Sequence, residues 1–313
     1  MFRKEVIFKT IRGHPRSHAS TIVQADNGDI LVAWYAGDFE GAANQAIFLS
    51  RLTDGKWTPP LKVVDTPGKP DGNPVLFRKK SGEVYLYYVV MHDRGWETCD
   101  IRYVVSNDQG FSWSPMKIFH KELGWMIRNE PIYLSTGEII FPIYDERDWS
   151  SIFLVSKDEG RTWIQSNKLI SRPGNIQPAV VELSDRSLLA FMRTNGKGGY
   201  IWYSRSFDHG LTWTNPKHTN FKNPNSAIDL IKLSNGSLLL AFNDSFNSRT
   251  PLSLILSEDE GETWKYYKVI EKREGEYSYP SLLEDKDGLI HLVYTNNRKN
   301  IAHVVFNLDW LMN

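Results

Sequence analysis

Short apolar runs alternate with turn residues along the whole chain, and the runs come in pairs. In the first pair, residues 20–25 and 30–34 are separated by Asn27-Gly28, a dipeptide typical of tight hairpin turns. Five further pairs repeat the order of run, turn and run: 74–78 with 84–90, 131–134 with 139–143, 179–183 with 188–192, 229–233 with 237–242, and 281–284 with 289–294. The pattern predicts six β-hairpins.

A motif of the form Ser-x-Asp-x-Gly-x-x-Trp follows these hairpins. It occurs four times, ending at Trp113, Trp163, Trp213 and Trp264, which are 50, 50 and 51 residues apart. A shortened copy ends at Trp57. The Ser and Asp side chains can hold a turn, the Gly can adopt a positive φ and the Trp can bury a large ring. This constant period indicates one repeated supersecondary unit.

Each unit contains enough apolar runs for four strands. A third run leads into the motif, as at residues 101–105 and 152–155, and a fourth follows it. Units of about 50 residues fit six times into 313 residues, which predicts a single domain over residues 1–313 built as a six-bladed β-propeller. The segment 5–9 is expected to supply the outer strand of the last blade.

The repeated motif resembles the Asp boxes of the sialidase (neuraminidase) superfamily, and the similarity extends over nearly the whole chain. The resemblance implies an all-β, sialidase-like propeller with four antiparallel strands per blade. It allows several activities, because Asp boxes also occur in lyases and in propellers that only bind.

Composition narrows the possible partners and location. Lys plus Arg and Asp plus Glu both number 37, so no overall charge favours nucleic acid or a membrane surface. Cys99 is the only cysteine, and no apolar run is long enough for a signal peptide or a membrane span. We expect a cytoplasmic protein with a carbohydrate substrate; the oligomeric state is left open.

Antiparallel order predicts where polar residues gather. The hairpin turns and the Asp boxes fall at one end of each blade, so the starts of the first strands and the loops after the second strands fall at the other. The polar residues at this second end are Arg16, His18, Asn73, Arg128, Glu130, Gln177, Asn225, Tyr277, Tyr279, Asp38, Glu40, His92, Asp93, Arg193 and Arg298. We interpret them as a ligand site at the mouth of the propeller.

The resemblance suggests roles for some of these residues. Tyr279-Pro-Ser-Leu282 is similar to the family's strand with the nucleophilic tyrosine, and Phe191-Met-Arg193 is similar to a strand end with a carboxylate-binding arginine. Asp38 and Glu40 occupy the region of the family's acid/base aspartate. Three positions differ from the family pattern: Gln177 where a glutamate is expected, and His18 and Asn225 where arginines are expected.

Several mechanisms remain open, and hydrolysis of a small, possibly acidic oligosaccharide is our first choice. It would use two carboxylates among Asp38, Glu40, Asp93, Glu130 and Asp229. A lyase would instead use His18 with Tyr279 or Tyr277 for β-elimination at a uronate, and Arg16, Arg128 or Arg193 would neutralise its carboxylate. An exo-sialidase proper and a noncatalytic glycan binder are further alternatives. Structural roles are also open, such as a strand-capping His18, a packed Tyr279 and a buried, salt-bridged Asp229.

Metal and cofactor sites are not expected. His14 and His18 have the spacing of ligands on a helix, but Pro15 and the strand that follows argue against a helix there. A structural calcium ion is left open.

Overall fold

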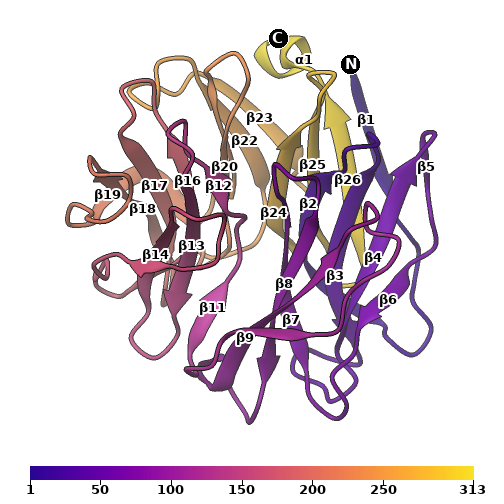
Figure 1. Cartoon of the computed structure of the whole chain (residues 1–313). Coiled ribbons are helices and arrows are strands. Elements are labelled where there is room, and N and C mark those ends of the chain that lie inside the picture. Colours follow the sequence, from indigo (N-terminus) through magenta and orange to yellow (C-terminus); the bar gives the residue numbers. More distant parts are fainter. The chain divides into compact units, whose positions relative to one another are not determined.

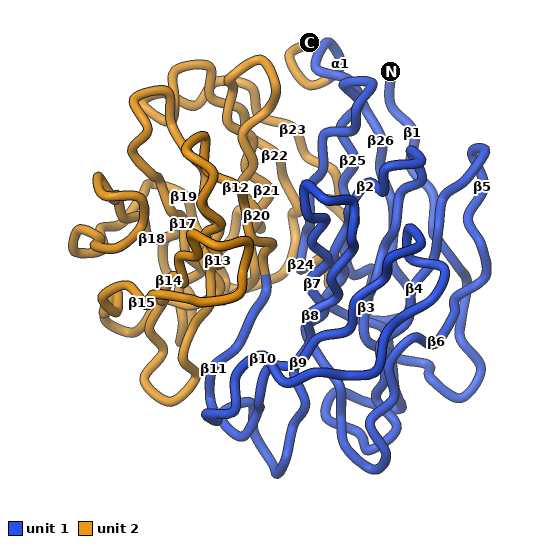
Figure 2. The backbone as a smooth tube through the Cα atoms, viewed as in Figure 1, with its two compact units in different colours: residues 1–128, 279–310 blue, residues 129–278, 311–313 orange.

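The computed structural model describes residues 1–313, and it is built almost entirely of β-strands (Figure 1). The chain divides into two compact units (Figure 2): unit 1 contains residues 1–128 and 279–310, and unit 2 contains residues 129–278 and 311–313. None of its helices has the length and apolarity that crossing a bilayer requires.

Unit 1 contains three antiparallel sheets. Their orders are β2-β3-β4-β5 with β6 also paired to β4, β10-β9-β8-β7, and β1-β26-β25-β24. The strands are β1 (Phe2–Val6), β2 (Arg16–Gln24), β3 (Ile30–Gly37), β4 (Ala46–Thr53), β5 (Lys56–Trp57), β6 (Leu61–Val64), β7 (Asp71–Arg78), β8 (Val84–Met91), β9 (Cys99–Ser106), β10 (Lys117–His120), β11 (Trp125–Ile127), β24 (Tyr277–Glu284, in unit 1 from Tyr279 on), β25 (Ile290–Asn296) and β26 (Asn300–Phe306). Two short helices are η1 (Trp96–Thr98) and α1 (Leu308–Met312).

Unit 2 also contains three antiparallel sheets. In the first, β13 pairs with both β12 and β14, and β14 pairs with β15; the others have the orders β16-β17-β18-β19 and β20-β21-β22-β23. The strands are β12 (Ile132–Tyr133), β13 (Ile139–Asp145), β14 (Ser150–Ser156), β15 (Ile164–Gln165), β16 (Asn175–Glu182), β17 (Leu188–Thr194), β18 (Gly199–Ser206), β19 (Lys217–Asn223), β20 (Asp229–Lys232), β21 (Leu238–Asn243), β22 (Leu252–Ser257) and β23 (Tyr266–Glu271). The six predicted hairpins are therefore confirmed as the strand pairs β2-β3, β7-β8, β12-β13, β16-β17, β20-β21 and β24-β25, one in each sheet.

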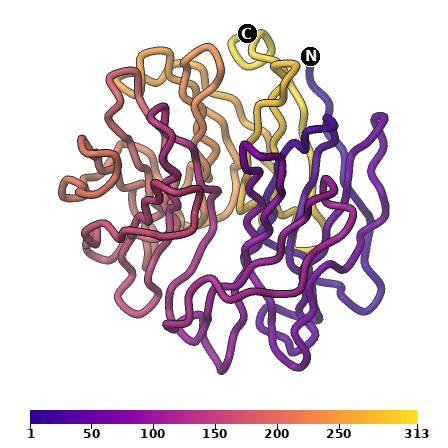
Figure 3. The backbone as a smooth tube through the Cα atoms, viewed as in Figure 1, coloured from indigo at the N-terminus to yellow at the C-terminus, as the bar shows by residue number.

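The N-terminal strand completes the last sheet. β1 pairs antiparallel with β26, from Phe2 opposite Phe306 to Val6 opposite Ala302, so the first and last strands of the chain lie side by side (Figure 3). This confirms the predicted outer strand, although it spans Phe2–Val6 and not residues 5–9. The predicted range lies too late in the chain because the apolar Ile7 and Phe8 suggested a strand, whereas they follow the strand and pack into the core beside Trp34.

The Asp boxes form turns at the ends of the third strands. In the third box, Asp208 Oδ1 accepts the backbone N–H of Thr212 at 2.8 Å, and Ser206 Oγ accepts that of Gly210 at 2.9 Å. Trp213 is buried, its Nε1 donates to the Gly210 carbonyl at 3.0 Å and its ring stacks on Phe153 at 4.0 Å between centroids. This box therefore closes its turn and packs its tryptophan.

Several first strands start earlier than predicted. β2, β7, β16 and β24 begin three or four residues before the apolar runs that indicated them. In β2, β7 and β16 the pairing register shifts near the start, which marks a β-bulge. The polar residues just before the apolar runs therefore belong to strands and not to loops, because backbone pairing continues on the N-terminal side of the bulge.

Candidate functional site

The pairing register fixes which end of each sheet carries the candidate residues. In the first sheet of unit 1, Gln24 pairs with Ile30 beside the hairpin turn, and Arg16 pairs with Gly37 at the opposite end. Arg51, near the end of β4, donates to Asp29 in that hairpin turn at 2.7 Å. The candidates of this sheet thus lie at the end away from its Asp-box-like turn.

An unusual backbone conformation recurs at this end of the first strands. Ala19, Asn73, Gln177 and Tyr279 have φ of 57°, 41°, 54° and 55°, in the left-handed region that residues other than glycine seldom adopt. Three of them, Asn73, Gln177 and Tyr279, directly precede a proline. Strained backbone of this kind is concentrated at functional sites, where a bulge redirects a side chain.

In unit 1, three candidates meet around Tyr279. Its ring centroid lies 4.2 Å from that of His18 and 5.2 Å from the Arg128 guanidinium carbon. Arg128 Nη2 donates to the Pro280 carbonyl at 2.8 Å, and His18 Nδ1 lies 2.8 Å from Thr295 Oγ1. All three side chains are buried. A phenol, an imidazole and a guanidinium therefore form one fixed cluster.

A small cavity of about 140 Å³ borders this cluster. It is lined by Arg16, Ser17, His18, Tyr35, Phe39, Glu40 and Arg298. Glu40 Oε2 forms an ion pair with Arg298 Nη1, whereas Arg16 is exposed and has no hydrogen bond or ion pair from its side chain. Asp38, in the same loop, is exposed, and its backbone N–H donates to Asn44 Oδ1 at 3.1 Å. The cavity is thus polar and offers an arginine to an anionic group.

His92 and Asp93 line a second, larger cavity of unit 1 and not this small one. His92 Nδ1 lies 2.7 Å from Lys69 Nζ, and its Nε2 lies 3.0 Å from Asp100 Oδ2. Asn73 is buried at its bulge.

In unit 2, three candidates form a hydrogen-bonded group around Arg193. Its Nη1 donates to Gln177 Oε1 at 2.9 Å and its Nε to Asn225 Oδ1 at 2.8 Å. Gln177 Nε2 in turn donates to the Tyr144 hydroxyl at 3.3 Å. Arg193 is buried, and two of the groups that hold its guanidinium are neutral amide oxygens.

Arg249 joins this group, although the sequence did not single it out. Its Nη2 donates to the Asn225 carbonyl at 3.4 Å, and its Nη1 pairs with Glu276 at 2.8 Å. Arg249 lies in the loop between β21 and β22, which is a loop after a second strand like those that carry other candidates, and this position in the sequence is the signal that could have identified it. Two arginines thus flank Asn225 in unit 2.

The remaining candidates of unit 2 are less accessible. Asp229 is 1% exposed, and its Oδ1 accepts the backbone N–H of Leu230 at 2.9 Å. Tyr277 is buried, with its backbone bonded to Arg249 and Asn243. Glu130 is half-buried. The burial of Asp229 favours its structural interpretation.

Asp71 is a buried carboxyl that the sequence did not distinguish. Burial raises its pKa to about 7, against a backbone hydrogen bond from Thr66 N–H at 2.7 Å that lowers it. Because its side chain is inaccessible, we do not place it among the groups that touch a ligand. No cluster of three or more His, Cys, Asp or Glu side chains suited to a metal ion is present in residues 1–313.

Comparison with known proteins identifies relatives. The family model for BNR repeat-like domains matches residues 28–292. A sialidase of Micromonospora viridifaciens is 24% identical over 351 aligned positions, which cover 96% of this chain and 52% of that protein. The chain spans about half or less of the length of the first curated relatives that it matches.

Solved structures agree on the fold. A leech intramolecular trans-sialidase superposes with a TM-score of 0.83 at 15% identity, over 99% of this chain and 71% of the other. A protein of unknown function from Dyadobacter fermentans gives 0.82 at 18% identity, over 97% and 98% of the two chains. These likenesses confirm the predicted all-β, sialidase-like six-bladed propeller with four-stranded antiparallel sheets.

Proposed function

We propose, from the premise that the chain belongs to the family of BNR repeat-like domains, that it is a glycoside hydrolase acting on a small, acidic oligosaccharide. The relatives named as sialidases support carbohydrate as the ligand class. The observation that carries the proposal is the buried cluster of Tyr279, His18 and Arg128 beside a polar cavity.

In this proposal Tyr279 is the nucleophile. Its hydroxyl oxygen attacks the anomeric carbon and its proton passes to His18, while the glycosidic oxygen leaves with a proton from Asp38 or Glu40. Water then attacks the glycosyl-tyrosine, the carboxylate accepts a water proton, and His18 returns its proton to the phenolate. Arg128 beside the ring stabilises the negative charge that develops on the phenol oxygen.

His18 supplies the base that the sequence departure removes. The resemblance places Gln177 where the family has a glutamate, and a neutral amide cannot accept the phenol proton. An imidazole can accept it, and His18 lies in contact with the tyrosine ring. This chain therefore combines a tyrosine nucleophile with a histidine base.

Two arginines among the candidate residues support an acidic substrate. In unit 1, Arg16 lines the small cavity with a free guanidinium. In unit 2, Arg193 is bonded to the neutral side chains of Gln177 and Asn225. Arginine binds carboxylates through paired, charge-assisted hydrogen bonds.

The test is hydrolysis of a panel of neutral and acidic oligosaccharides, detected by newly formed reducing ends. Tyr279→Phe should lower kcat/KM by about 10³ or more, because the nucleophile is lost. His18→Gln should lower kcat and remove the acidic limb of the pH profile. The control is Tyr200→Phe, at an exposed tyrosine of unit 2, which should change neither quantity. Wild-type turnover that survives Tyr279→Phe would refute the proposed nucleophile.

Contact between His18 and Tyr279 also favours a second function, a lyase acting on a uronate. One group would remove the proton next to the carboxylate and the other would protonate the leaving oxygen, leaving a carbon–carbon double bond in the product. The same panel distinguishes the two, since only elimination produces an unsaturated uronate that absorbs in the ultraviolet. Binding of a panel sugar without either product would instead indicate a noncatalytic glycan binder.

A further inference from the structure

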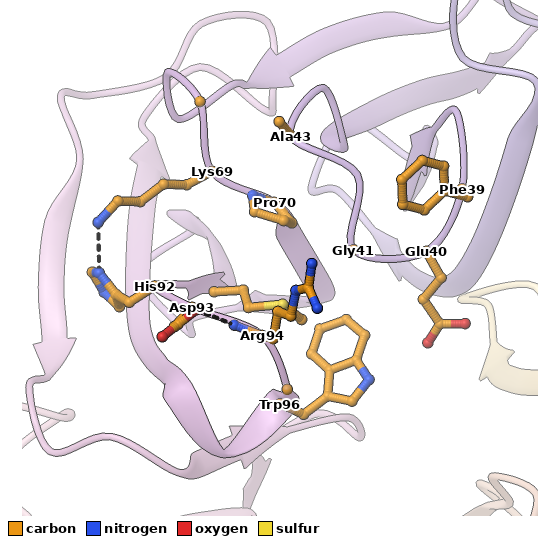
Figure 4. A pocket seen from close by; sticks show the side chains of 13 residues that line it. Phe39, Glu40, Gly41, Ala43, Lys69, Pro70, His92, Asp93, Arg94 and Trp96 are labelled. Carbon is orange, nitrogen blue, oxygen red and sulfur yellow. Dashed lines mark hydrogen bonds between the residues drawn. The ribbon is translucent and has the colours of Figure 1, made fainter.

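The second cavity of unit 1 shares Phe39 and Glu40 with the small one and otherwise has a different lining. Its volume is about 810 Å³, and it is bounded by the loops before β4, before β7 and after β8 (Figure 4). The aromatic and charged or titratable side chains of its lining include Phe39, Glu40, Lys69, His92, Arg94 and Trp96. A cavity of this size accommodates a sugar unit.

Two cations in this cavity have no carboxylate partner. Arg94 is exposed, and its guanidinium makes no hydrogen bond or ion pair within the chain. Lys69 makes one side-chain hydrogen bond, to His92 at 2.7 Å (Figure 4). The two carboxylates of the lining are engaged elsewhere: Glu40 pairs with Arg298, and Asp93 Oδ1 accepts the backbone N–H of Arg94 at 2.8 Å.

Neighbouring polar side chains hold Lys69 in place. An ammonium group can only donate, so His92 Nδ1 accepts the hydrogen bond from Lys69, and His92 Nε2 lies 3.0 Å from Asp100 Oδ2. Asp100 is itself held by two hydrogen bonds from Arg102, at 2.9 and 3.1 Å. Lys69 is therefore positioned, and its charge is not neutralised by a direct partner.

Trp96 forms a fixed aromatic wall of the same cavity. A Cβ atom on Gly72 would lie 2.9 Å from the Trp96 ring, so the indole packs directly on a backbone without a side chain. Thr98 Oγ1 ties the loop by donating to the carbonyls of Asp93 and Gly95 at 3.0 and 2.8 Å. The half-buried indole offers the kind of rigid apolar surface on which sugar rings bind.

We propose that this cavity is a subsite for a sugar unit bearing an anionic group, with the ring on Trp96 and the anion bound by the cationic lining, Arg94 first and Lys69 as the second cation. Because Phe39 and Glu40 line both cavities, the acidic unit would be a neighbour of the sugar that is cleaved beside His18. The proposal rests on the proposed function, and it extends that function by assigning the acidic group to a unit next to the reacting one.

Binding of single sugars tests the subsite separately from catalysis. Calorimetric titration would compare methyl glucuronide and glucose 6-sulfate, which carry a carboxylate and a sulfate, with neutral methyl glucoside at low salt. We expect one or both acidic sugars to bind at least about tenfold more tightly than the glucoside, as charge-assisted hydrogen bonds to arginine predict. Which acidic sugar binds more tightly identifies the anionic group.

Variants locate the binding. Arg94→Gln should weaken the binding of acidic sugars about tenfold, and Trp96→Ala should weaken the binding of all three sugars. The control is Arg12→Gln, at an exposed arginine of unit 1 outside both cavities, which should have no effect on binding. Tyr279→Phe should retain the binding, which separates this subsite from the catalytic proposal. Equal affinity for acidic and neutral sugars, no binding of either acidic sugar, or full affinity in Arg94→Gln would each overturn the proposal.

Discussion

Arg128 is a charged side chain with 1% exposure, and two contacts define its role. It donates to the Pro280 carbonyl and lies over the Tyr279 ring, both at the strained start of β24. A planar group with several donors can make both contacts together, because one N–H donates to the carbonyl while the guanidinium carbon lies over the ring.

We therefore predict that Arg128→Lys lowers kcat/KM by about tenfold to a hundredfold, and that it destabilises the protein by about 1–3 kcal/mol through the unsatisfied carbonyl. Steady-state kinetics and urea unfolding measure the two effects. Arg161→Lys, at an exposed Asp-box position, is the matched control and should change neither. A fully active Arg128→Lys variant would contradict the assigned role.

Asp71 makes stability depend on pH in a direction opposite to that of an ordinary carboxylate. Burial raises its pKa from 3.8 to about 7, so the folded protein retains a proton there that the unfolded chain releases. Its contribution is fully present below about pH 4 and is lost as the pH rises through 7.

Asp71→Asn should accordingly gain stability relative to the wild type as the pH rises from 5 to 8, by on the order of a few kcal/mol. Urea unfolding at both pH values measures the difference. Asp54→Asn, at an exposed aspartate, should show none. A stability difference that is the same at both pH values would show that Asp71 is not protonated in the folded protein.

At the scale of elements, a row of buried side chains crosses the sheet that contains both β1 and β26. His291 Nδ1 lies 2.9 Å from His303 Nε2, and the row continues to Asp285 at one end and Glu5 at the other. Burial lowers the pKa of His303 to about 3, helped by the nearby His291 and Arg3, and burial also lowers the pKa of His291. Both rings are therefore neutral when folded.

Acidification should weaken this sheet. Below about pH 6.5 the histidines of the unfolded chain become protonated, whereas those of the folded protein stay neutral. The free energy of unfolding therefore falls as the pH drops from 6.5 toward 3. Urea unfolding at pH 7 and 5 should give a smaller loss for His303→Gln than for the wild type, whatever the variant costs at pH 7. His209, a half-buried histidine outside this row, supplies the control substitution, His209→Gln. Identical losses in all three proteins would contradict the assignment.

The Asp boxes act as separate elements of the whole molecule. Asp108 and Asp208 each hold a turn through the same set of bonds, in unit 1 and in unit 2 respectively, and they share no partner. Hydrogen bonds to Ser112 lower the pKa of Asp108 to about 2.

Substitutions at these two boxes should therefore add. Asp108→Asn and Asp208→Asn should each lower the Tm by a few degrees, and the double variant should lower it by their sum, because sites without shared partners are energetically independent. Differential scanning calorimetry measures all three, with Asp54→Asn as the exposed control. A double variant no less stable than either single variant would show coupling between the boxes.

Most of the fold could be predicted from the sequence, because the residues that specify the turns and strands are close together in the chain and recur from repeat to repeat. The hairpin turn at Gly28 and the box ending at Trp213 each specify a short segment, and the 50-residue period repeats that specification. The starts of β2, β7 and β16 could not be predicted, because a bulge has no apolar alternation to reveal it.

The candidate site was predictable in outline and not in its contacts. Antiparallel order places Tyr279 and Arg193 at strand ends, but the contact between His18 and Tyr279 joins residues 261 positions apart, which no local pattern encodes. Arg249 lies in a loop outside the repeat, and the raised pKa of Asp71 depends on burial by distant residues. These features come from tertiary packing.

The shared left-handed backbone at Asn73, Gln177 and Tyr279 has an evolutionary consequence. Each of the three precedes a proline in the first hairpin strand of its sheet, so two amide side chains and one phenol stand on the same local backbone conformation. Exchanging the residue at one of these positions would change the functional group that is presented, while the backbone conformation that presents it is kept.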